Sequence, residues 1–152
     1  MLLAPFPVYW LGGSFQGMSI TEAVRDPSGA YSVQYGSCVE GGQSTCVPRL
    51  RVVTSPDNSF LPAGAGPRRT ARVRGATAIL AQEGKTIEIP TAGVVVDIYA
   101  RSAFVASAAA QTVVPINRVG APRERLPVGL PDTGFAETPL PAQRPSPLRR
   151  LR

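Results

Sequence analysis

Several short stretches of this chain alternate between hydrophobic and polar residues, which is the pattern of a half-buried β-strand. The alternation is cleanest in residues 30–35 (AYSVQY), where the aromatic and branched side chains share one face and the serine and glutamine share the other. Residues 47–54 are predicted to return beside them as a second strand. Residues 7–12 (PVYWLG) predict an earlier strand, because aromatic and branched residues favour the pleated surface of a sheet.

The second half of the chain predicts a three-stranded meander. Residues 72–81 form its first strand, and a tight turn at residues 83–85 (EGK) leads into residues 86–89 (TIEI). Residues 94–99 (VVVDIY) form the third strand. They are apolar on both faces apart from one acid, so this strand is predicted to lie in the middle of the sheet.

Two stretches predict helices. Residues 18–27 (MSITEAVRDP) contain a capping box, in which Ser19 caps the helix and Glu22 reaches back to the cap. Residues 102–114 (SAFVASAAAQTVV) are rich in alanine, with Ser102 as the cap. The predicted buried face of this second helix consists of Phe104, Val105, Ala108, Ala109 and Thr112.

Together these elements predict the α+β class: a mostly antiparallel sheet of about five to six strands, with one short N-terminal helix and one long C-terminal helix on one face. The single domain is predicted to cover residues 1–119. Residues 120–152 carry seven of the 16 prolines and few large apolar side chains. Proline blocks both helices and central strands, so this segment is predicted to be a disordered tail rich in proline and arginine.

Composition excludes several kinds of chemistry. The chain contains no histidine, so neither a Ser-His-Asp nor a Cys-His centre can form. Histidine-based zinc, copper and iron sites are excluded for the same reason, and two cysteines cannot complete an all-cysteine site. We therefore expect no metal and no cofactor, and a non-enzymatic function is favoured. The apolar runs are too short for a transmembrane helix, which needs about 18 residues or more.

Three segments of the chain resemble small proteins of high-GC Gram-positive bacteria. They are LGGSFQGMSIT (11–21), YGSCVEGGQSTCVPRLRVV (35–53) and RGATAILAQEGKTIEIPTAGVVVDIYARSAF (74–104). Those proteins share LG-x-x-F-x-G, then YG-x-C and C-x-P, then a terminal strand and helix. The resemblance covers about residues 11–115. The family is uncharacterised and often exported, so the resemblance implies a compartment and no particular activity.

Cys38 and Cys46 are predicted to form a disulfide. Seven residues lie between them, in a glycine-rich loop at the end of the hairpin of residues 30–35 and 47–54. Facing positions near the end of a hairpin bring Cα atoms to the distance of about 5.5 Å that a disulfide needs. The alternatives are free buried thiols and a redox pair, although redox pairs usually have C-x-x-C spacing. A disulfide favours an oxidising compartment.

Arginines gather in residues 68–74 (RRTARVR), within a chain of net charge +6. In an extended strand Arg68, Arg72 and Arg74 share one face, so together with Arg69 they are a candidate site for nucleic acid or another polyanion. The alternative is a solvated strand edge whose charges prevent pairing with other strands. The segment has no interleaved aromatic residues to stack on bases, which favours this alternative.

Asp97 is the single acid within the apolar strand of residues 94–99. A buried carboxylate must be paired, hydrogen-bonded or neutral. Asp97 is thus a candidate general acid or base for a small enzyme that works without histidine. The alternative, which we favour, is a structural partner for Arg72, Arg101 or a backbone amide.

Both ends of the chain carry features of export signals that are incomplete. Leu130–Gly134 (LPDTG) matches the LP-x-TG motif that sortases cleave, but the segment after it is short, charged and broken by prolines, so it cannot span a membrane. Residues 1–13 lack a positive region and a cleavage site, so we interpret them as a core strand rather than a signal peptide.

The sequence therefore predicts a small exported or envelope-associated domain, acting as a non-enzymatic interaction or structural module with a protein or envelope partner. A cytoplasmic location is the alternative, since no complete export signal is found. A nucleic-acid or polyanion binder using Arg68–Arg74 and a small enzyme using Asp97 are the two alternative functions.

Overall fold

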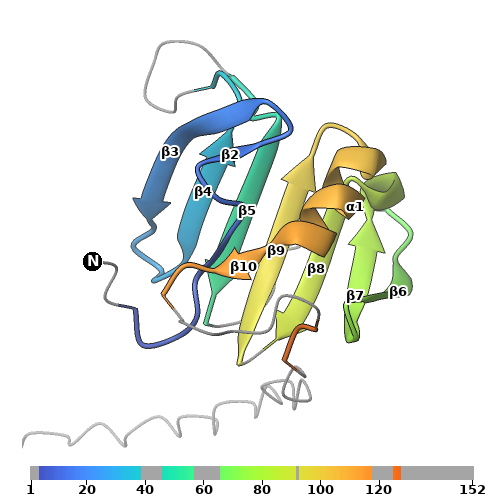
Figure 1. Ribbon diagram of the computed structural model, residues 1–152. Helices are drawn as coiled ribbons and strands as arrows, with labels where there is room; N and C mark the ends of the chain where they lie inside the picture. Colours follow the sequence, from blue (N-terminus) through green and yellow to red (C-terminus); the bar gives the residue numbers. More distant parts are fainter. Residues whose placement is uncertain (1–3, 39–45, 57–65, 92, 118–124, 128–152) are drawn as a thin grey trace, which may run out of the picture.

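The computed structural model describes residues 4–38, 46–56, 66–91, 93–117 and 125–127. In this part of the chain, one α-helix lies across one face of an antiparallel sheet of eight strands (Figure 1). The mostly antiparallel sheet and the C-terminal helix are confirmed. The sheet has more strands than the five to six that the sequence predicts.

The strands of the sheet follow the order β2-β3-β4-β5-β9-β8-β7-β6. They are β2 (Ser14–Phe15), β3 (Met18–Arg25), β4 (Tyr31–Tyr35), β5 (Leu50–Ser55), β6 (Arg69–Val73), β7 (Ala76–Ala81), β8 (Thr86–Thr91) and β9 (Val94–Ala100). Each half of the chain forms a meander, and pairing of β5 with β9 joins the two halves. Strand β9 lies between β5 and β8, so the prediction of a central strand at residues 94–99 is confirmed.

The first predicted strand is shorter than expected and lies outside this sheet. Only Tyr9–Trp10 forms a strand, β1, and it pairs with β10 (Val114–Pro115). The pair places the N-terminal segment beside the end of the helix. Two segments far apart in sequence thus meet, which a local pattern of residues does not reveal.

The predicted N-terminal helix is wrong. Met18–Arg25 forms β3, an eight-residue strand that pairs with β4 from Ile20 to Arg25. Ile20, Thr21 and Val24 are β-branched, and such side chains favour an extended backbone. Pairing with β4 therefore outweighs the capping box, which is a purely local signal.

The single strand predicted for residues 72–81 is also wrong, because β6 and β7 are two strands joined by a turn. Arg74 and Gly75 form this turn, and both have positive φ (48° and 87°). Type I′ hairpin turns require positive φ at both central positions, and glycine adopts it without strain. The turn removes Arg74 from the strand, so Arg68, Arg72 and Arg74 do not share one strand face as predicted.

Helix α1 (Ala103–Thr112) begins where the sequence predicts, since the Val105 N–H donates to Ser102 Oγ at 3.3 Å. The predicted buried face is only partly right. Ala106, Ala109 and Ala110 are the fully buried residues of the helix. Phe104, by contrast, is 76% exposed. The alanines let the helix lie close to the sheet, so the helix rotates to bury them rather than the larger side chain.

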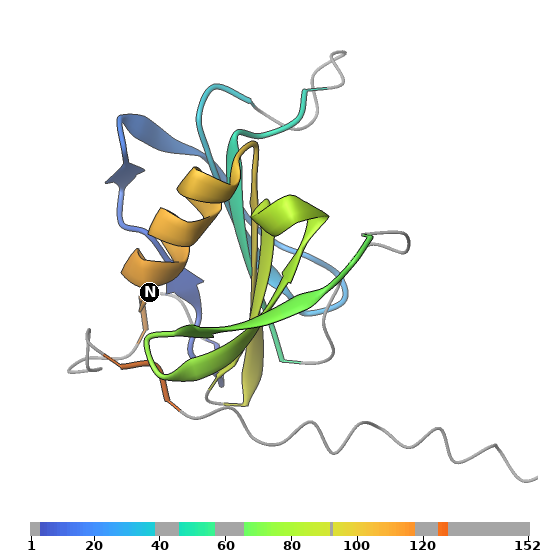
Figure 2. The same cartoon turned by 90° about the vertical axis from the view of Figure 1, so that its right-hand side faces the viewer.

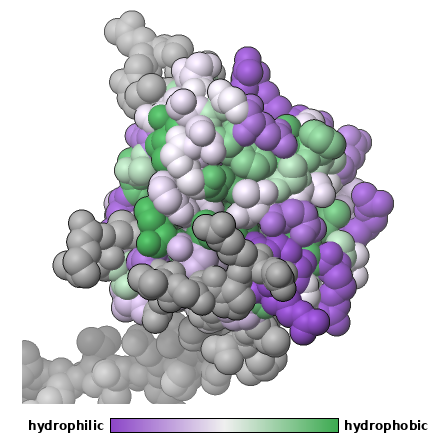
Figure 3. Space-filling view, viewed as in Figure 1, coloured by the Kyte–Doolittle hydropathy of each residue, from purple (hydrophilic) through white to green (hydrophobic). Residues whose placement is uncertain are grey.

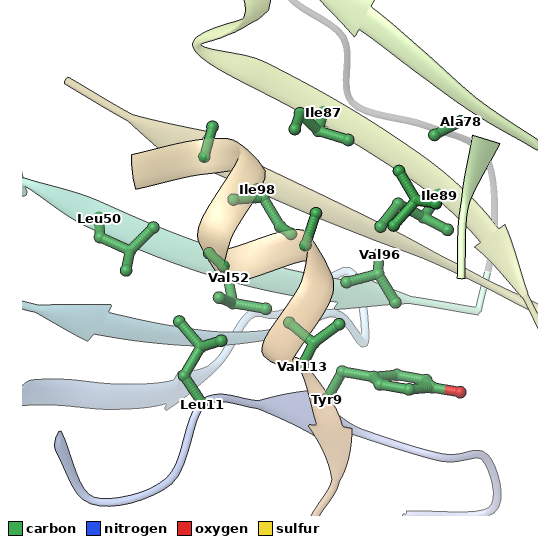
Figure 4. Packing of buried hydrophobic residues seen from close by; sticks show 14 of the residues in the cluster. Tyr9, Leu11, Leu50, Val52, Ala78, Ile87, Ile89, Val96, Ile98 and Val113 are labelled. Atoms are coloured by element: carbon green, nitrogen blue, oxygen red, sulfur yellow. The ribbon is translucent and has the colours of Figure 1, made fainter. Parts of the chain in front are cut away.

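Helix α1 lies over one face of the sheet (Figure 2), and the hydrophobic core fills the space between them (Figure 4). The sheet contributes alternate residues of its inner strands, because successive side chains of a strand point to opposite faces. These are Leu50, Val52, Ala78, Ile87, Ile89, Val96 and Ile98. Tyr9, Leu11 and Val113 close the core beside the helix (Figure 4).

A short piece of the predicted tail contacts the domain. Leu126 is buried, and its N–H donates to the carbonyl oxygen of Arg74 at 3.0 Å. Thr91 Oγ1 donates to the carbonyl oxygen of Pro127 at 2.6 Å. Residues 125–127, which the sequence assigns to the tail, therefore pack beside the turn between β6 and β7. The motif at Leu130–Gly134 lies outside the described residues.

Candidate functional site

An apolar groove of about 250 Å³ lies between the N-terminal segment and strands β3 and β4. Its apolar walls are formed by Val8, Trp10, Ile20, Ala23, Val24, Val33 and Ile116. Ala23 is exposed and Ile116 is 45% exposed, so the groove opens to solvent. Figure 3 shows hydrophobic side chains at the surface on the left of that view, the side on which β3 lies.

Asn117 holds the N-terminal wall of this groove in place. Its Oδ1 accepts from the Val8 N–H at 2.9 Å, and its Nδ2 donates to the carbonyl oxygen of Phe6 at 2.7 Å. The Ile116 N–H donates to the carbonyl oxygen of Val8 at 2.8 Å. One side chain thus fixes the backbone of a segment more than 100 residues away, and the sequence alone carries no signal for this.

The polar part of the groove lies at its rim. The Arg25 guanidinium carbon lies 5.8 Å from the centroid of the Tyr31 ring. The Phe6 ring meets Tyr31 edge-on, with the two ring centroids 5.8 Å apart. A concave apolar site with a few polar groups at its edge is the usual form of a small-molecule binding site. The walls of the groove come from three separate parts of the chain, so the sequence gives no local signal for it.

The face of the sheet opposite α1 carries a row of polar side chains across five neighbouring strands. Cross-strand pairing places them side by side in the order Glu22, Gln34, Arg51, Tyr99 and Thr86. Gln34 Nε2 donates to Glu22 Oε2 at 3.2 Å, and Arg51 Nε donates to the hydroxyl oxygen of Ser32 at 2.7 Å. Arg51 and Tyr99 also line a second hollow of about 320 Å³.

Asp97 lies on this polar face, directly opposite Glu88 of the neighbouring strand. Asp97 is fully buried and Glu88 is 5% exposed. Burial raises the pKa of the nearby Tyr99, the negative charges of Asp97 and Glu88 raise it further, and Arg51 acts in the opposite direction. A general acid or base must touch its substrate, and Asp97 has no surface that faces solvent. The arrangement therefore suits a structural acid better than a catalytic one.

Arginines of the predicted basic site lie in different local settings. Arg68 and Arg69 are exposed at the start of β6. Arg72 Nη1 donates to the carbonyl oxygen of Gly75 at 2.9 Å. Arg74 donates to the carbonyl oxygen of Val113, and burial lowers the pKa of this arginine. The Arg74 guanidinium thus links the turn to the end of α1, whereas the Arg72 bond is local and its side chain stays exposed.

Cys38 and Cys46 form a disulfide, with their Cα atoms 5.7 Å apart. The bond lies just beyond the paired ends of β4 and β5, where Tyr35 is opposite Leu50. Cys38 is buried. The pairing and its place at the end of a hairpin are those that the spacing predicts.

Compared with protein-family models, curated proteins and solved structures, the chain shows no match. In the described part of the chain, no helix has both the length and the apolar surface that crossing a membrane requires. Among the same residues, no three histidine, cysteine or acidic side chains come together in a way that could hold a metal ion. The groove, the polar face and the disulfide are therefore the features from which a function is argued.

Proposed function

We propose that this chain is a non-enzymatic binding module, exported or associated with the cell envelope, and that its groove holds the apolar part of a small ligand. One observation carries the proposal. The groove is walled almost entirely by hydrophobic side chains, yet two of these, Ala23 and Ile116, remain well exposed. When an apolar ligand covers a hydrophobic surface that is concave and open to water, the free energy of the system falls.

The disulfide between Cys38 and Cys46 supports the proposed compartment. Disulfides persist in oxidising surroundings and are rare in the reducing cytoplasm. The bond closes a small loop, and closing such a loop stabilises a fold by about 2–3 kcal/mol. A small domain outside the cell gains from such a crosslink, because its hydrophobic core is limited.

A binding role is better supported than the two alternatives. Asp97 is fully buried on the polar face, so a substrate could reach it only if the surrounding side chains moved away. Nucleic-acid binding through this segment would use Arg74 as well, whereas Arg74 is half-buried and bonds to the carbonyl oxygen of Val113. The groove needs no such rearrangement to accept a ligand.

Fluorescence of Trp10 can report ligand binding in the groove, because Trp10 lines the groove and is the single tryptophan of the chain. We expect decanol, added below its solubility limit, to shift the Trp10 emission to shorter wavelength in a saturable way. Ala23→Phe places a ring in the groove and should abolish the response. Thr77→Phe is the matched control, since Thr77 is exposed on β7 and does not line the groove.

Two results would contradict the proposed binding role. The first is a Trp10 emission that does not change in a saturable way with decanol. The second is an equal response in the wild type and in Ala23→Phe, with both proteins shown to be folded by circular dichroism.

The compartment is tested separately, by fractionating cells and measuring the intact mass with and without reductant. Recovery of the chain from the cytoplasm with two free thiols would contradict it.

A further inference from the structure

Resting on the proposed function, we propose that the groove binds a single-chain anionic amphiphile. Its hydrocarbon chain lies along the apolar walls, and its negatively charged head group binds Arg25 at the rim. A fatty acid is the simplest member of this chemical class.

Charge at the rim is the first argument. Arg25 is the single charged residue among those that line the groove. Its side chain is exposed, and its guanidinium lies beside the Tyr31 ring, 5.8 Å from the ring centroid. An aromatic ring beside a guanidinium limits the positions that the side chain adopts. Arg25 is therefore placed where the polar end of a ligand would leave the groove.

The distribution of acids is the second argument. The neighbouring residue, Asp26, does not line the groove but lines the separate hollow with Arg51 and Tyr99. The Asp26 carboxylate accepts from the Ser28 N–H at 2.8 Å. Glu22 accepts from Gln34 on the polar face of the sheet. The two acids of β3 and its following turn are thus directed away from the groove, and the positive charge of Arg25 is left to act on a ligand.

The apolar walls are the third argument, because they fit a hydrocarbon chain better than a peptide. The amide groups of a peptide need hydrogen-bond partners when they are buried. The groove lining is hydrophobic apart from Arg25, Tyr31 and Ser32, so few partners are present. A hydrocarbon chain needs none, and each methylene that it buries should raise the affinity by about fourfold.

The experiment compares three ligands with the same ten-carbon chain and different heads: decanoate, decanol and decylammonium. Decanoate and decylammonium are titrated below their micelle-forming concentrations and decanol below its solubility limit, and binding is followed by the Trp10 emission. We expect decanoate to bind most tightly and decylammonium least tightly. Arg25→Gln should weaken decanoate binding about fivefold to tenfold, the scale of one exposed charge-assisted hydrogen bond, and should change decanol binding less than about twofold.

Two further variants keep the result interpretable. Arg69→Gln removes an exposed arginine from β6, on the opposite edge of the sheet, and should leave all three affinities unchanged. Arg25→Lys retains the charge and should retain the preference for decanoate. If Arg25→Gln fails to fold, the preference of the wild type and of Arg25→Lys for decanoate over decylammonium decides the question.

The outcomes separate this inference from the proposed function. Equal affinity for the three ligands, or a preference for decylammonium, would overturn the anionic head group while leaving an apolar binding groove. Weaker decanoate binding in Arg69→Gln by the same factor as in Arg25→Gln would also overturn it, because the effect would then reflect net charge alone. If none of the three ligands binds, both the inference and the proposed function are wrong.

Discussion

The two faces of the sheet differ completely, although the same strands build them. On β8 and β9, Ile87 and Ile98 point toward the helix, whereas Glu88 and Asp97 point to the other side. The helix face is covered by α1 and the N-terminal segment. On the opposite face, the described residues form a polar row that holds itself together by side-chain hydrogen bonds. The helix face is thus packed with hydrophobic side chains, whereas the opposite face combines hydrogen-bonded polar side chains with a few apolar ones such as Val53.

The proposed binding groove lies on the helix side of the sheet. The N-terminal segment covers part of the sheet there, and it leaves the β3 end of the apolar surface exposed. On the opposite face, the described hollow is lined by the polar residues Asp26, Ser28, Ser32, Arg51 and Tyr99 as well as by Ala30 and Val53. Substitutions on the two faces should therefore have different effects on stability.

The largest effect is expected in the core on the helix side. Ile98 is fully buried, so Ile98→Ala should lower the free energy of unfolding by about 3 kcal/mol through lost packing and a new cavity. Val95 is the matched control, since it lies on the same strand, is half-buried and faces the other way. Val95→Ala should cost about 1 kcal/mol. Urea denaturation measures both, and equal costs would contradict the contrast.

The disulfide should stabilise both faces of the sheet equally, because it joins the ends of β4 and β5. Replacing both cysteines with serine should lower the free energy of unfolding by about 2–3 kcal/mol. In that background the costs of Ile98→Ala and Val95→Ala should be unchanged, since distant sites are usually additive. A loss that is confined to one face would show that the crosslink supports that face specifically. Denaturation of the double and triple variants measures this.

Asp26→Asn should lower the free energy of unfolding at neutral pH and have less effect at low pH. Hydrogen bonds from Ser28 lower the pKa of the exposed Asp26 carboxyl. Asp26 thus adds stability above its unfolded pKa, and this contribution is lost as the pH falls through the folded value. The variant should therefore match the wild type more closely at low pH than at neutral pH.

The smallest effect is expected from the tyrosines, and it should be visible only at alkaline pH. Burial raises the pKa of Tyr35 on the helix face and of Tyr99 on the polar face, where the two acids add to it. A tyrosine whose folded pKa exceeds its unfolded value of about 10 adds stability that is complete below that pH and lost as the pH rises. Tyr99→Phe should reduce the alkaline loss of stability more than Tyr35→Phe does. Equal effects in melts between pH 9 and 11 would contradict the influence of the acids.

The sequence predicts elements well where their signal is both local and sufficient. The alternation in residues 30–35 predicts β4, and the apolar run of residues 94–99 predicts the central strand β9. Ser102 predicts the start of α1, because a cap depends on residues that are close in the chain. The spacing of the two cysteines likewise predicts the disulfide.

Prediction from the sequence fails where contacts between distant residues decide which structure a segment adopts. The capping box of Ser19 and Glu22 competes with the pairing of β3 and β4, and the pairing prevails. The turn at Arg74 and Gly75 is missed, because arginine is not a usual turn residue and the strands on both sides are similar in pattern. The groove depends on Asn117 holding the N-terminal segment, which no periodicity could indicate.

The central claim is that the exposed end of the apolar face, and not the polar face, is the binding site. Amide chemical shifts recorded during a titration with decanoate test it most directly, because each face reports through its own residues. We expect saturable shifts at Trp10, Ala23 and Ile116, with Arg51 and Tyr99 unchanged. Shifts centred on Arg51 and Tyr99, or no saturable shifts at all, would contradict the account.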